Sequence, residues 1–378
     1  MAVGDSTNFI GGHLSRKIRV TRKVFLLRFA IATIIVTLPF LASTHLMKAL
    51  VLHGKNESFS YEDVADPAPG AGDLVVQIKA AALNHRDLWI QKGLYAGLKF
   101  PIVLGSDGFG TVLTVGEGVD RALVGSAVII NPGLQWGERP EAQDAKFKIL
   151  GLPDDGTLAE RVKVPASAVV AAPKQLTPEQ AAALPLAGLT AFRTLFTRSK
   201  LCAGERVLVT GIGGGVALFA LQFAVAAGAH VWVTSGSDEK IARAVGLGAG
   251  GGANYKKSDW VEALKSLVPA GFDVIIDSAG GPGFSKLVDL AAPGGRIAFF
   301  GATLGNPPDV DLRRIFWKQV SLLGSTMGSP AEFSDMVAIV EKHNIVPLAD
   351  KVFPLEDGNA AFAAMDQAEQ FGKIVLVP

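Results

Sequence analysis

Cysteine is nearly absent from this sequence. Cys202 is the single cysteine among 378 residues. An internal disulfide and a metal site built from several thiolates are therefore excluded. A chain without disulfides suits a reducing compartment, so we expect a cytoplasmic protein in which Cys202 is an ordinary small thiol.

An excess of charge of one sign is also missing. The chain has 36 Lys and Arg against 35 Asp and Glu, a net charge of +1, and a sequence pI of about 7.8. Without a basic surface, nucleic acid is a poor partner. With 49% hydrophobic residues, the 378-residue chain can bury a large core and divide into two domains.

Acidic residues are scarce in the first 46 positions, where Asp5 stands alone. Six basic residues between positions 16 and 28 precede an apolar run at 29–42. This order is typical of a signal peptide or a short anchor, although a membrane span takes about 20 residues. Because Met47 starts a strand-like segment, an over-called start and a disordered tail are the alternatives. Export or membrane anchoring through residues 16–42 depends on the first interpretation.

Short β-rich segments punctuated by Gly and Pro extend from Met47 to about Lys163. This spacing predicts a small barrel-like β domain. Its strands are expected at 47–53, 59–64, 73–83, 108–115 and 126–130. A helix is expected to begin at Pro178, because Thr177 and Gln180 form a capping-box pattern around it.

Apolar strands alternate with helical stretches after residue 205, which is typical of a doubly wound parallel sheet. The strands are expected at 206–210, 230–234, 272–278, 295–300 and 321–325, and the helices at 214–227 and 237–246. A closing strand at 372–376 is expected to return to the first domain. The sequence thus predicts an α/β fold with domains at 47–174 plus 328–378 and at 175–327, after an extension at 1–46.

A glycine cluster joins the strand at 206–210 to the following helix. The turn residues are Gly211, Gly213, Gly214, Gly215 and Val216. Glycines at such a turn let the backbone approach a pyrophosphate, and the helix N-terminus attracts the anion. The strict G-x-G-x-x-G pattern fails at Val216, whereas the spacing Gly211, Gly214, Ala217 fits. A tight turn without a ligand is the alternative.

The end of the next strand predicts which nucleotide binds. Sites specific for NAD place an acid there on the ribose 2′-hydroxyl, but here the strand closes without one. Ser235 and Ser237 can donate to a 2′-phosphate and Lys240 can neutralise it, which favours NADPH over NADH. Ser237 also suits a helix N-cap, and Asp238 in the first turn is the reason that NADH stays open.

Together these patterns resemble the medium-chain dehydrogenase/reductase superfamily, in its zinc-independent, quinone oxidoreductase-like branch, from Met47 to Pro378. The segment Asn-His-Arg-Asp at 84–87 resembles the Cys-His-x-Asp motif of the zinc-dependent alcohol dehydrogenases, with Asn84 in place of the cysteine ligand. The Gly-Ser-Asp segment at 105–107 resembles Gly-His-Glu, with Ser106 in place of the histidine. The lobe at 131–156, which holds a structural zinc in those enzymes, has no cysteine. The resemblance implies a GroES-like barrel domain, a Rossmann domain and no zinc.

The same resemblance implies roles for individual residues. It makes Asn84, Tyr95 and Thr190 the catalytic candidates, with Thr190 beside the nicotinamide and Tyr95 facing the substrate. It adds cofactor contacts at Thr190, Tyr255, Ser278, Gly301, Thr303 and Lys373. It also implies a homodimer.

Several of these polar residues have a purely structural alternative. Asn84 and Asp87 have the spacing of an N-cap with an acid at the third helical position, which predicts a capping carboxylate. Tyr95 suits an interface aromatic, His85 a surface or packed histidine, and Arg86 a solvated charge or an ion-pair partner.

The sequence therefore predicts an NADPH-dependent reductase of quinones or carbonyl-conjugated double bonds, with enoyl thioesters as a further acceptor class. Without a metal, the charge that develops on the substrate oxygen needs hydrogen-bond donors, and the Tyr95 hydroxyl and the Asn84 amide are the candidates. An alcohol dehydrogenase or aldehyde reductase with recruited metal is one alternative. An NADPH-binding protein without turnover is the other.

Overall fold

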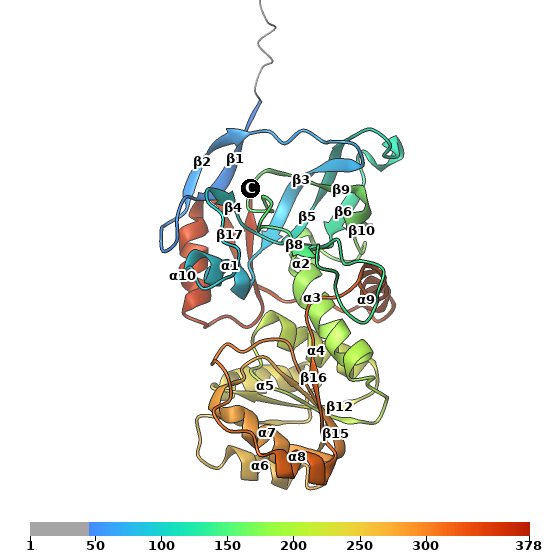
Figure 1. Cartoon of the computed structure of the whole chain (residues 1–378), viewed down its shortest axis with the longest axis vertical. Coiled ribbons are helices and arrows are strands. Elements are labelled where there is room, and N and C mark those ends of the chain that lie inside the picture. The colour runs from blue at the N-terminus through green and yellow to red at the C-terminus, as the bar shows by residue number, and fades with distance from the viewer. Residues whose placement is uncertain (1–44) are drawn as a thin grey trace, which may run out of the picture. The chain divides into compact units, whose positions relative to one another are not determined.

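Residues 45–378 are described by a computed structural model and form one compact unit (Figure 1). The predictions made for residues 1–44 lie outside the described residues. Within the described part, no helix is both long enough and apolar enough to cross a membrane.

An antiparallel sheet and a mixed sheet form the β-rich part of the unit. The smaller has the order β2-β1-β4, and the larger has the order β10-β6-β5-β3-β18-β17 with β9 on β3. The bounds are β1 (Leu46–Leu52), β2 (Ser60–Ala65), β3 (Asp73–Ala82), β4 (Ile102–Val103), β5 (Asp107–Val115), β6 (Ala127–Ile130), β9 (Arg161–Pro165), β10 (Val169–Ala171), β17 (Ala349–Pro354) and β18 (Lys373–Val377). The five strands expected here are confirmed to within one residue at each end. The expected return of the chain is confirmed too, because β18 pairs with β3.

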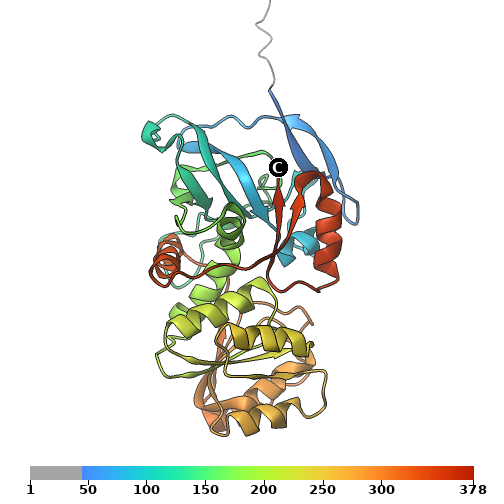
Figure 2. The same ribbon diagram turned by 180° about the vertical axis from the view of Figure 1, so that it is seen from behind.

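The core of this part lies between the two sheets and α10 (Gly358–Asp366). Leu50 on β1, Val76 on β3 and Phe362 on α10 are among its buried members. The barrel-like core thus joins segments from both ends of the described chain. Strand β18 carries the C-terminal residues into the same sheet as β3 (Figure 2).

A six-stranded sheet with the order β13-β12-β11-β14-β15-β16 forms the other part. All of its pairs are parallel. The bounds are β11 (Arg206–Val209), β12 (His230–Ser235), β13 (Gly252–Asn254), β14 (Phe272–Asp277), β15 (Ala291–Phe299) and β16 (Ser321–Gly324). The predicted doubly wound parallel sheet is therefore confirmed, and β13 is a strand that the sequence pattern missed.

Helices cover both faces of the parallel sheet. Val207 and Val209 belong to the core formed with α4 (Gly215–Ala226), whereas Leu208 between them belongs to the core formed with α6 (Trp260–Leu267) and α7 (Phe284–Leu290). Figure 1 shows α7 and α8 (Leu312–Lys318) in front of the sheet, and Figure 2 shows α4 and α5 (Asp238–Gly246) in front from behind. Burial of both faces explains why the strands are apolar throughout.

Two helices connect the parts. The expected helix begins at Pro178 as α2 (Pro178–Ala183), with the capping box of Thr177 and Gln180 present. It ends early because Pro185 lacks a backbone N–H, and α3 (Pro185–Phe192) starts there. Helix α3 packs against α4 and against α9 (Pro330–Lys342).

Candidate active site

The glycine turn lies between β11 and α4. Gly211 and Gly213 have φ values of +64° and +125°, where a side chain would be strained. A methyl group placed on Gly211 or Gly214 would meet no atom within 4 Å, so the turn is open. The first N–H groups of α4 have no partner within the helix and point their dipoles outward. This open turn, which continues into Gly215 and Val216, fits the pyrophosphate of a dinucleotide.

Two lysines flank the turn. A methyl group on Gly215 would lie 2.7 Å from Cδ of Lys373, and one on Gly213 would lie 3.0 Å from Cδ of Lys240. The ammonium of Lys240 donates to the carbonyl of Ala368 at 2.9 Å, and burial lowers the pKa of this lysine. Lys240 is thus placed beside the glycine turn and is already hydrogen bonded.

The hydroxyl groups at the end of β12 take part in local hydrogen bonds. Ser235 is buried, and its hydroxyl donates to Ile212 O at 3.4 Å and accepts from the Ser237 N–H at 3.3 Å. The Ser237 hydroxyl accepts from the Lys240 N–H at 3.3 Å and caps α5. The N-cap prediction for Ser237 is confirmed, and both hydroxyl groups shape the turn.

Tyr255 and Lys256 lie over the same turn. A methyl group on Gly236 would be 2.8 Å from Cε of Lys256 and 2.9 Å from the hydroxyl oxygen of Tyr255. Tyr255 was predicted to touch the cofactor, whereas Lys256 was missed. The signal for Lys256 was its position beside Tyr255. The sequence does not distinguish it from Lys257, which follows it and instead pairs with Asp238.

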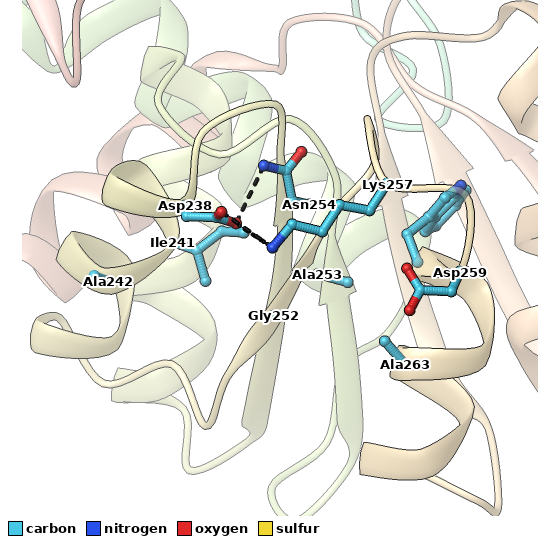
Figure 3. Close-up of a pocket in the computed structure, with 10 residues that line it drawn as sticks. Asp238, Ile241, Ala242, Gly252, Ala253, Asn254, Lys257, Asp259 and Ala263 are labelled. Carbon is cyan, nitrogen blue, oxygen red and sulfur yellow. Dashed lines mark hydrogen bonds and ion pairs between the residues drawn. The ribbon is translucent and has the colours of Figure 1, made fainter.

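Asp238, in the first turn of α5, forms a hydrogen bond and an ion pair with neighbouring side chains. Figure 3 shows Asn254 and Lys257 converging on its carboxylate, with Lys257 at 3.1 Å and the Asn254 amide also at 3.1 Å. The hydrogen bonds from Lys257 and Asn254 lower the pKa of the Asp238 carboxyl. A pocket of about 390 Å³ opens beside them, with Asp259 and Trp260 in its wall. The carboxylate is therefore neutralised by a neighbouring lysine.

Loops at the ends of β14 and β15 meet the same carboxyl edge of the sheet. The N–H and the hydroxyl of Thr303 donate to Ser278 O at 3.2 Å and 3.4 Å. A methyl group on Gly301 would lie 3.0 Å from Ser278 O. Thr210 donates to the buried Asp277 at 2.6 Å, which ties the glycine turn to β14. The structure therefore brings together Ser278, Gly301 and Thr303, as predicted for one cofactor site.

A buried polar trio joins the β-rich part to α3. Lys373 Nζ donates to Asn84 Oδ1 at 2.5 Å and to Asp107 Oδ2 at 2.9 Å. Asn84 Nδ2 donates to Asp107 Oδ2 at 3.0 Å. The other oxygen of Asp107 accepts the Leu186 N–H at 2.8 Å, in the first turn of α3. One N–H of the predicted Asn84 donor is thus already used, and Asp107, which the sequence reading left without a role, fixes α3.

Helix α3 carries Thr190, the candidate beside the nicotinamide. Thr190 is buried, and its hydroxyl donates to Leu186 O at 2.8 Å, one turn earlier in the helix. The carbonyl of Thr190 accepts from the Thr194 hydroxyl at 2.6 Å. The Thr190 side chain is therefore held by its own helix, and the lone pairs of its oxygen stay available as acceptors.

Helix α1 (His85–Gln91) starts at the trio. The Asp87 carboxylate accepts the Asn84 N–H at 2.8 Å, which confirms the prediction of a capping carboxylate. Burial raises the pKa of Asp87, and the nearby Arg86 opposes that rise. His85 is exposed next to them, yet the protein around the ring and the Lys373 charge lower its pKa.

Arg86 is the unexpected member of this site. Arg86 is only 7% exposed, so of its two structural alternatives the solvated charge is wrong. Nη1 donates to the Ser106 hydroxyl at 2.9 Å and to Leu150 O at 3.0 Å. Cζ lies 5.1 Å from the centre of the Tyr95 ring. Asp87 Oδ1 is 3.8 Å from Nη1, at the limit of an ion pair.

Comparison with known proteins decides the family. The alcohol dehydrogenase GroES-like domain matches residues 70–174, and the zinc-binding dehydrogenase domain matches residues 215–342. A zinc-type alcohol dehydrogenase-like protein YogA from Leptosphaeria maculans is 39% identical over 83% of this chain and 92% of its own length. The chain belongs to the medium-chain dehydrogenase/reductase superfamily. It is an oxidoreductase of that superfamily, and its fold pairs a GroES-like domain with a Rossmann-like parallel sheet, as the sequence predicted.

Two further members of the superfamily frame the question of activity. An acryloyl-coenzyme A reductase from Metallosphaera sedula is 29% identical over 87% of this chain and 99% of its own. A crystal structure named as an NAD-dependent alcohol dehydrogenase is similar with a TM-score of 0.84 and 36% identity, covering 88% of this chain and all of that one. Members with different chemistry therefore share this fold.

The donor set does not fit the catalytic zinc of the superfamily. Asn84 and Ser106 offer an amide and a hydroxyl where thiolate and imidazole are needed, and the carboxylate of Asp107 is bound by Lys373. The cationic Arg86 donates directly to Ser106. Within residues 45–378, no three His, Cys, Asp or Glu side chains lie together as a metal site.

Arg193 anchors the lobe at 131–156 through hydrogen bonds to its backbone. Arg193 is buried and donates to Pro140 O at 3.1 Å and to Glu141 O at 2.7 Å. It also pairs with Glu332 on α9 at 2.7 Å and lies 4.8 Å from the centre of the Trp136 ring. A guanidinium therefore anchors the lobe that a structural zinc organises in other members.

Proposed function

We propose that this protein is an NADPH-dependent reductase of carbonyl-conjugated double bonds, including those of quinones, that works without catalytic zinc. The observation that carries the proposal is the replacement of metal ligands by Asn84 and Ser106, with the buried cation of Arg86 hydrogen bonded to Ser106. Such a site offers hydrogen-bond donors and a fixed positive charge in place of a Lewis acid.

The nucleotide would occupy the carboxyl edge of the parallel sheet. The turn from Gly211 to Val216 would hold the pyrophosphate. Ser278, Gly301, Thr303 and Lys373 would line the rest of the cofactor site, which would reach Thr190 on α3. Bound NADPH supplies the hydride. Lys256 and Tyr255, which lie over Gly236, would meet the 2′-phosphate, because an ammonium and a hydroxyl are donors suited to a dianion.

The substrate side of the site has to stabilise negative charge on oxygen. When hydride adds to the β-carbon, the electrons of the C=C bond move to the carbonyl oxygen and form an enolate. A solvent proton then adds to the α-carbon and completes the reduction. The Tyr95 hydroxyl and the remaining N–H of Asn84 are donors for that oxygen, and burial strengthens such hydrogen bonds.

An unconjugated ketone is a harder acceptor for these residues. Its reduction places a full charge on an alkoxide, which zinc stabilises in the alcohol dehydrogenases whose names several relatives carry. The site described here has no ligand set for that ion. The relative named acryloyl-coenzyme A reductase supports a conjugated acceptor instead.

The proposal is tested by offering the purified full-length protein three acceptors of similar size with NADPH. They are a cyclic enone, an ortho-quinone and the saturated ketone that corresponds to the enone. We expect NADPH to be consumed with the enone or the quinone and not with the ketone. Turnover with the ketone alone would favour the alcohol dehydrogenase alternative, and tight NADPH binding without any turnover would favour a binding protein.

A further inference from the structure

We propose that Arg86 is the group that takes over the role of the metal, by binding the carbonyl oxygen of the substrate and stabilising its negative charge. The inference rests on the proposed function and narrows its substrate class. The acceptor is an α,β-unsaturated carbonyl compound or a quinone, in which charge develops on one oxygen atom within reach of a guanidinium.

Arg86 lies among the residues that stand at the zinc-ligand positions. Its Nη1 is 2.9 Å from the hydroxyl of Ser106, one of the residues that stand where the family has zinc ligands. The next residue, Asp107, is hydrogen bonded to Asn84, the other such position, and to the first turn of the Thr190 helix. The guanidinium therefore lies among the residues that replace the metal.

Part of the hydrogen-bonding capacity of Arg86 is unused by the protein. Its Nε is buried without a partner, and Nη2 donates to no acceptor within residues 45–378. The nearest carboxylate oxygen, Asp87 Oδ1, is 3.8 Å from Nη1 and is itself without a hydrogen bond. A buried cation in this state costs free energy unless another acceptor reaches it.

Arginines with a structural role in this molecule direct Nη2 at a protein acceptor. Arg296 does so on Glu205, although its Nε, like that of Arg86, is buried without a partner. Arg206 uses Nε and Nη2 together on Asp273, at 2.8 Å and 2.6 Å. Arg193 pairs with Glu332 and donates from Nη2 to Glu141 O. In contrast, Nη2 of Arg86 has no protein acceptor within residues 45–378 and, unlike Nε, is not fully enclosed by protein, so it is the N–H group that an oxygen anion can reach.

The chemistry of the guanidinium suits the reaction. Arginine keeps its proton at every working pH, so it binds the enolate oxygen without transferring a proton to it. The attraction between the guanidinium and the substrate oxygen increases as that oxygen becomes negative. This interaction therefore stabilises the transition state more than the bound substrate. The Tyr95 ring, whose centre is 5.1 Å from Cζ, packs against the guanidinium and helps to hold it in place.

A spectroscopic titration tests this role without catalysis. The probe is 4-nitrophenol, whose phenolate resembles the enolate and is yellow, added to the full-length protein saturated with NADP⁺ at a pH about one unit below the pKa of the free phenol. We expect wild type to bind the phenol as phenolate, R86K to do so in part, and R86Q to bind it as the neutral phenol. R206Q is the matched control, because it removes an arginine outside the site.

Two spectroscopic results would overturn the proposal. One is a phenolate signal in R86Q equal to that of wild type. The other is the lack of any phenolate signal in wild type, because the site would then not favour an oxygen anion.

Steady-state kinetics give the second readout. For enone reduction we expect kcat/KM of R86Q to fall at least about 100-fold, with the NADPH dissociation constant unchanged. R86K is expected to retain more activity than R86Q because it keeps the charge. If R86Q fails to bind NADPH, the comparison of R86K with wild type tests the role of Arg86 instead. Activity of R86Q within about threefold of wild type would contradict the role of Arg86.

The two proposals fail in different ways. Wild type that binds NADPH and phenolate but reduces no conjugated acceptor would contradict the proposed function and leave the anion site intact. If R86Q reduces the enone as fast as wild type does, only the role of Arg86 is contradicted and the proposed function stands.

Discussion

Lys256 shows how a single side chain can select the coenzyme. Its Cε and the hydroxyl of Tyr255 both lie over Gly236, at the end of β12, while Asp238 is neutralised by Lys257. The charge that would repel a 2′-phosphate is thus cancelled, and a second lysine is placed to attract it. This arrangement favours NADPH.

We therefore expect Lys256→Gln to raise the dissociation constant of NADPH about tenfold, because one charge-assisted contact is worth about 1.4 kcal/mol. The dissociation constant of NADH should stay the same. Both constants can be measured by the quenching of protein fluorescence. Lys265→Gln on α6 is the control, since it removes the same charge from an exposed position away from Gly236. Equal weakening of both coenzymes would contradict a role in reading the phosphate.

Residue roles were predictable from sequence where the interaction is local. The Asn84 and Asp87 spacing gave the helix cap, and Ser237 gave the start of α5. The burial of Arg86 was not predictable, because it depends on Ser106 and Leu150, which the fold brings in from other segments. The same holds for Lys373, which was predicted as a cofactor contact and is also the donor that ties Asn84 to Asp107.

At the scale of the elements, the lobe at 131–156 depends on α3, α9 and the π-helical segment Arg193–Arg198. Arg193→Ala would leave Glu332 buried without its partner, which costs about 3–5 kcal/mol. The expected fall in Tm is about 4–7 °C for a chain of this size. The double variant R193M/E332L should recover part of that loss, because it removes both charges from the interior. A Tm of Arg193→Ala within about 1 °C of wild type would contradict the anchor.

The parallel sheet contains an ion pair that links stability to pH. Arg206 on β11 donates to Asp273 on β14 through Nε and Nη2. These hydrogen bonds hold the pKa of the Asp273 carboxyl below its ordinary value. A lowered pKa favours the ionised form in the folded state. The stability from the pair is therefore present above the ordinary pKa and is lost as pH falls through the lowered one.

Asp273→Asn should accordingly lower stability by about 1–2 kcal/mol at neutral pH, a range typical of a partly exposed charged hydrogen bond. The difference from wild type should shrink as the pH is taken below the ordinary aspartate range. Thermal unfolding across that pH range measures it. A difference that stays constant into acid would show that Asp273 acts through packing and not through its charge.

The sequence predicted most strands of both parts because glycine and proline mark their ends and apolar β-branched residues fill them. Strand β13 was missed, since Gly-Ala-Asn has little strand propensity and exists through its pairing with β12. Helix α2 was expected at its start but not at its end, where Pro185 begins α3. Which strand a short segment pairs with, and where a helix ends within an apolar run, depend on tertiary contacts that the sequence pattern does not show.

At the scale of the whole molecule, the outer edge of the parallel sheet carries an apolar surface. Strand β16 pairs only with β15 among the described residues, and Leu322 on it is 39% exposed. On α8, Phe316 and Trp317 are 66% and 82% exposed. An exposed edge strand beside large apolar side chains is a surface that a second copy of the chain would cover.

We expect a homodimer that uses this edge. Light scattering coupled to size-exclusion chromatography should give a mass twice that of the 39.5 kDa chain. Trp317→Glu should lower the measured mass to that of a single chain. Val245→Glu, at an exposed apolar position on α5, should leave the mass unchanged. A Trp317→Glu protein that stays dimeric would place the interface elsewhere.

In our proposal, the guanidinium of Arg86 serves the reduction of conjugated carbonyl compounds at the place where related enzymes use zinc. The most direct measurement is zinc content and NADPH-dependent enone reduction on one sample of full-length protein, before and after dialysis against a chelator. We expect turnover that is unchanged by the chelator and unrelated to the zinc content. Turnover that disappears with the zinc and returns when zinc is added would contradict this proposal.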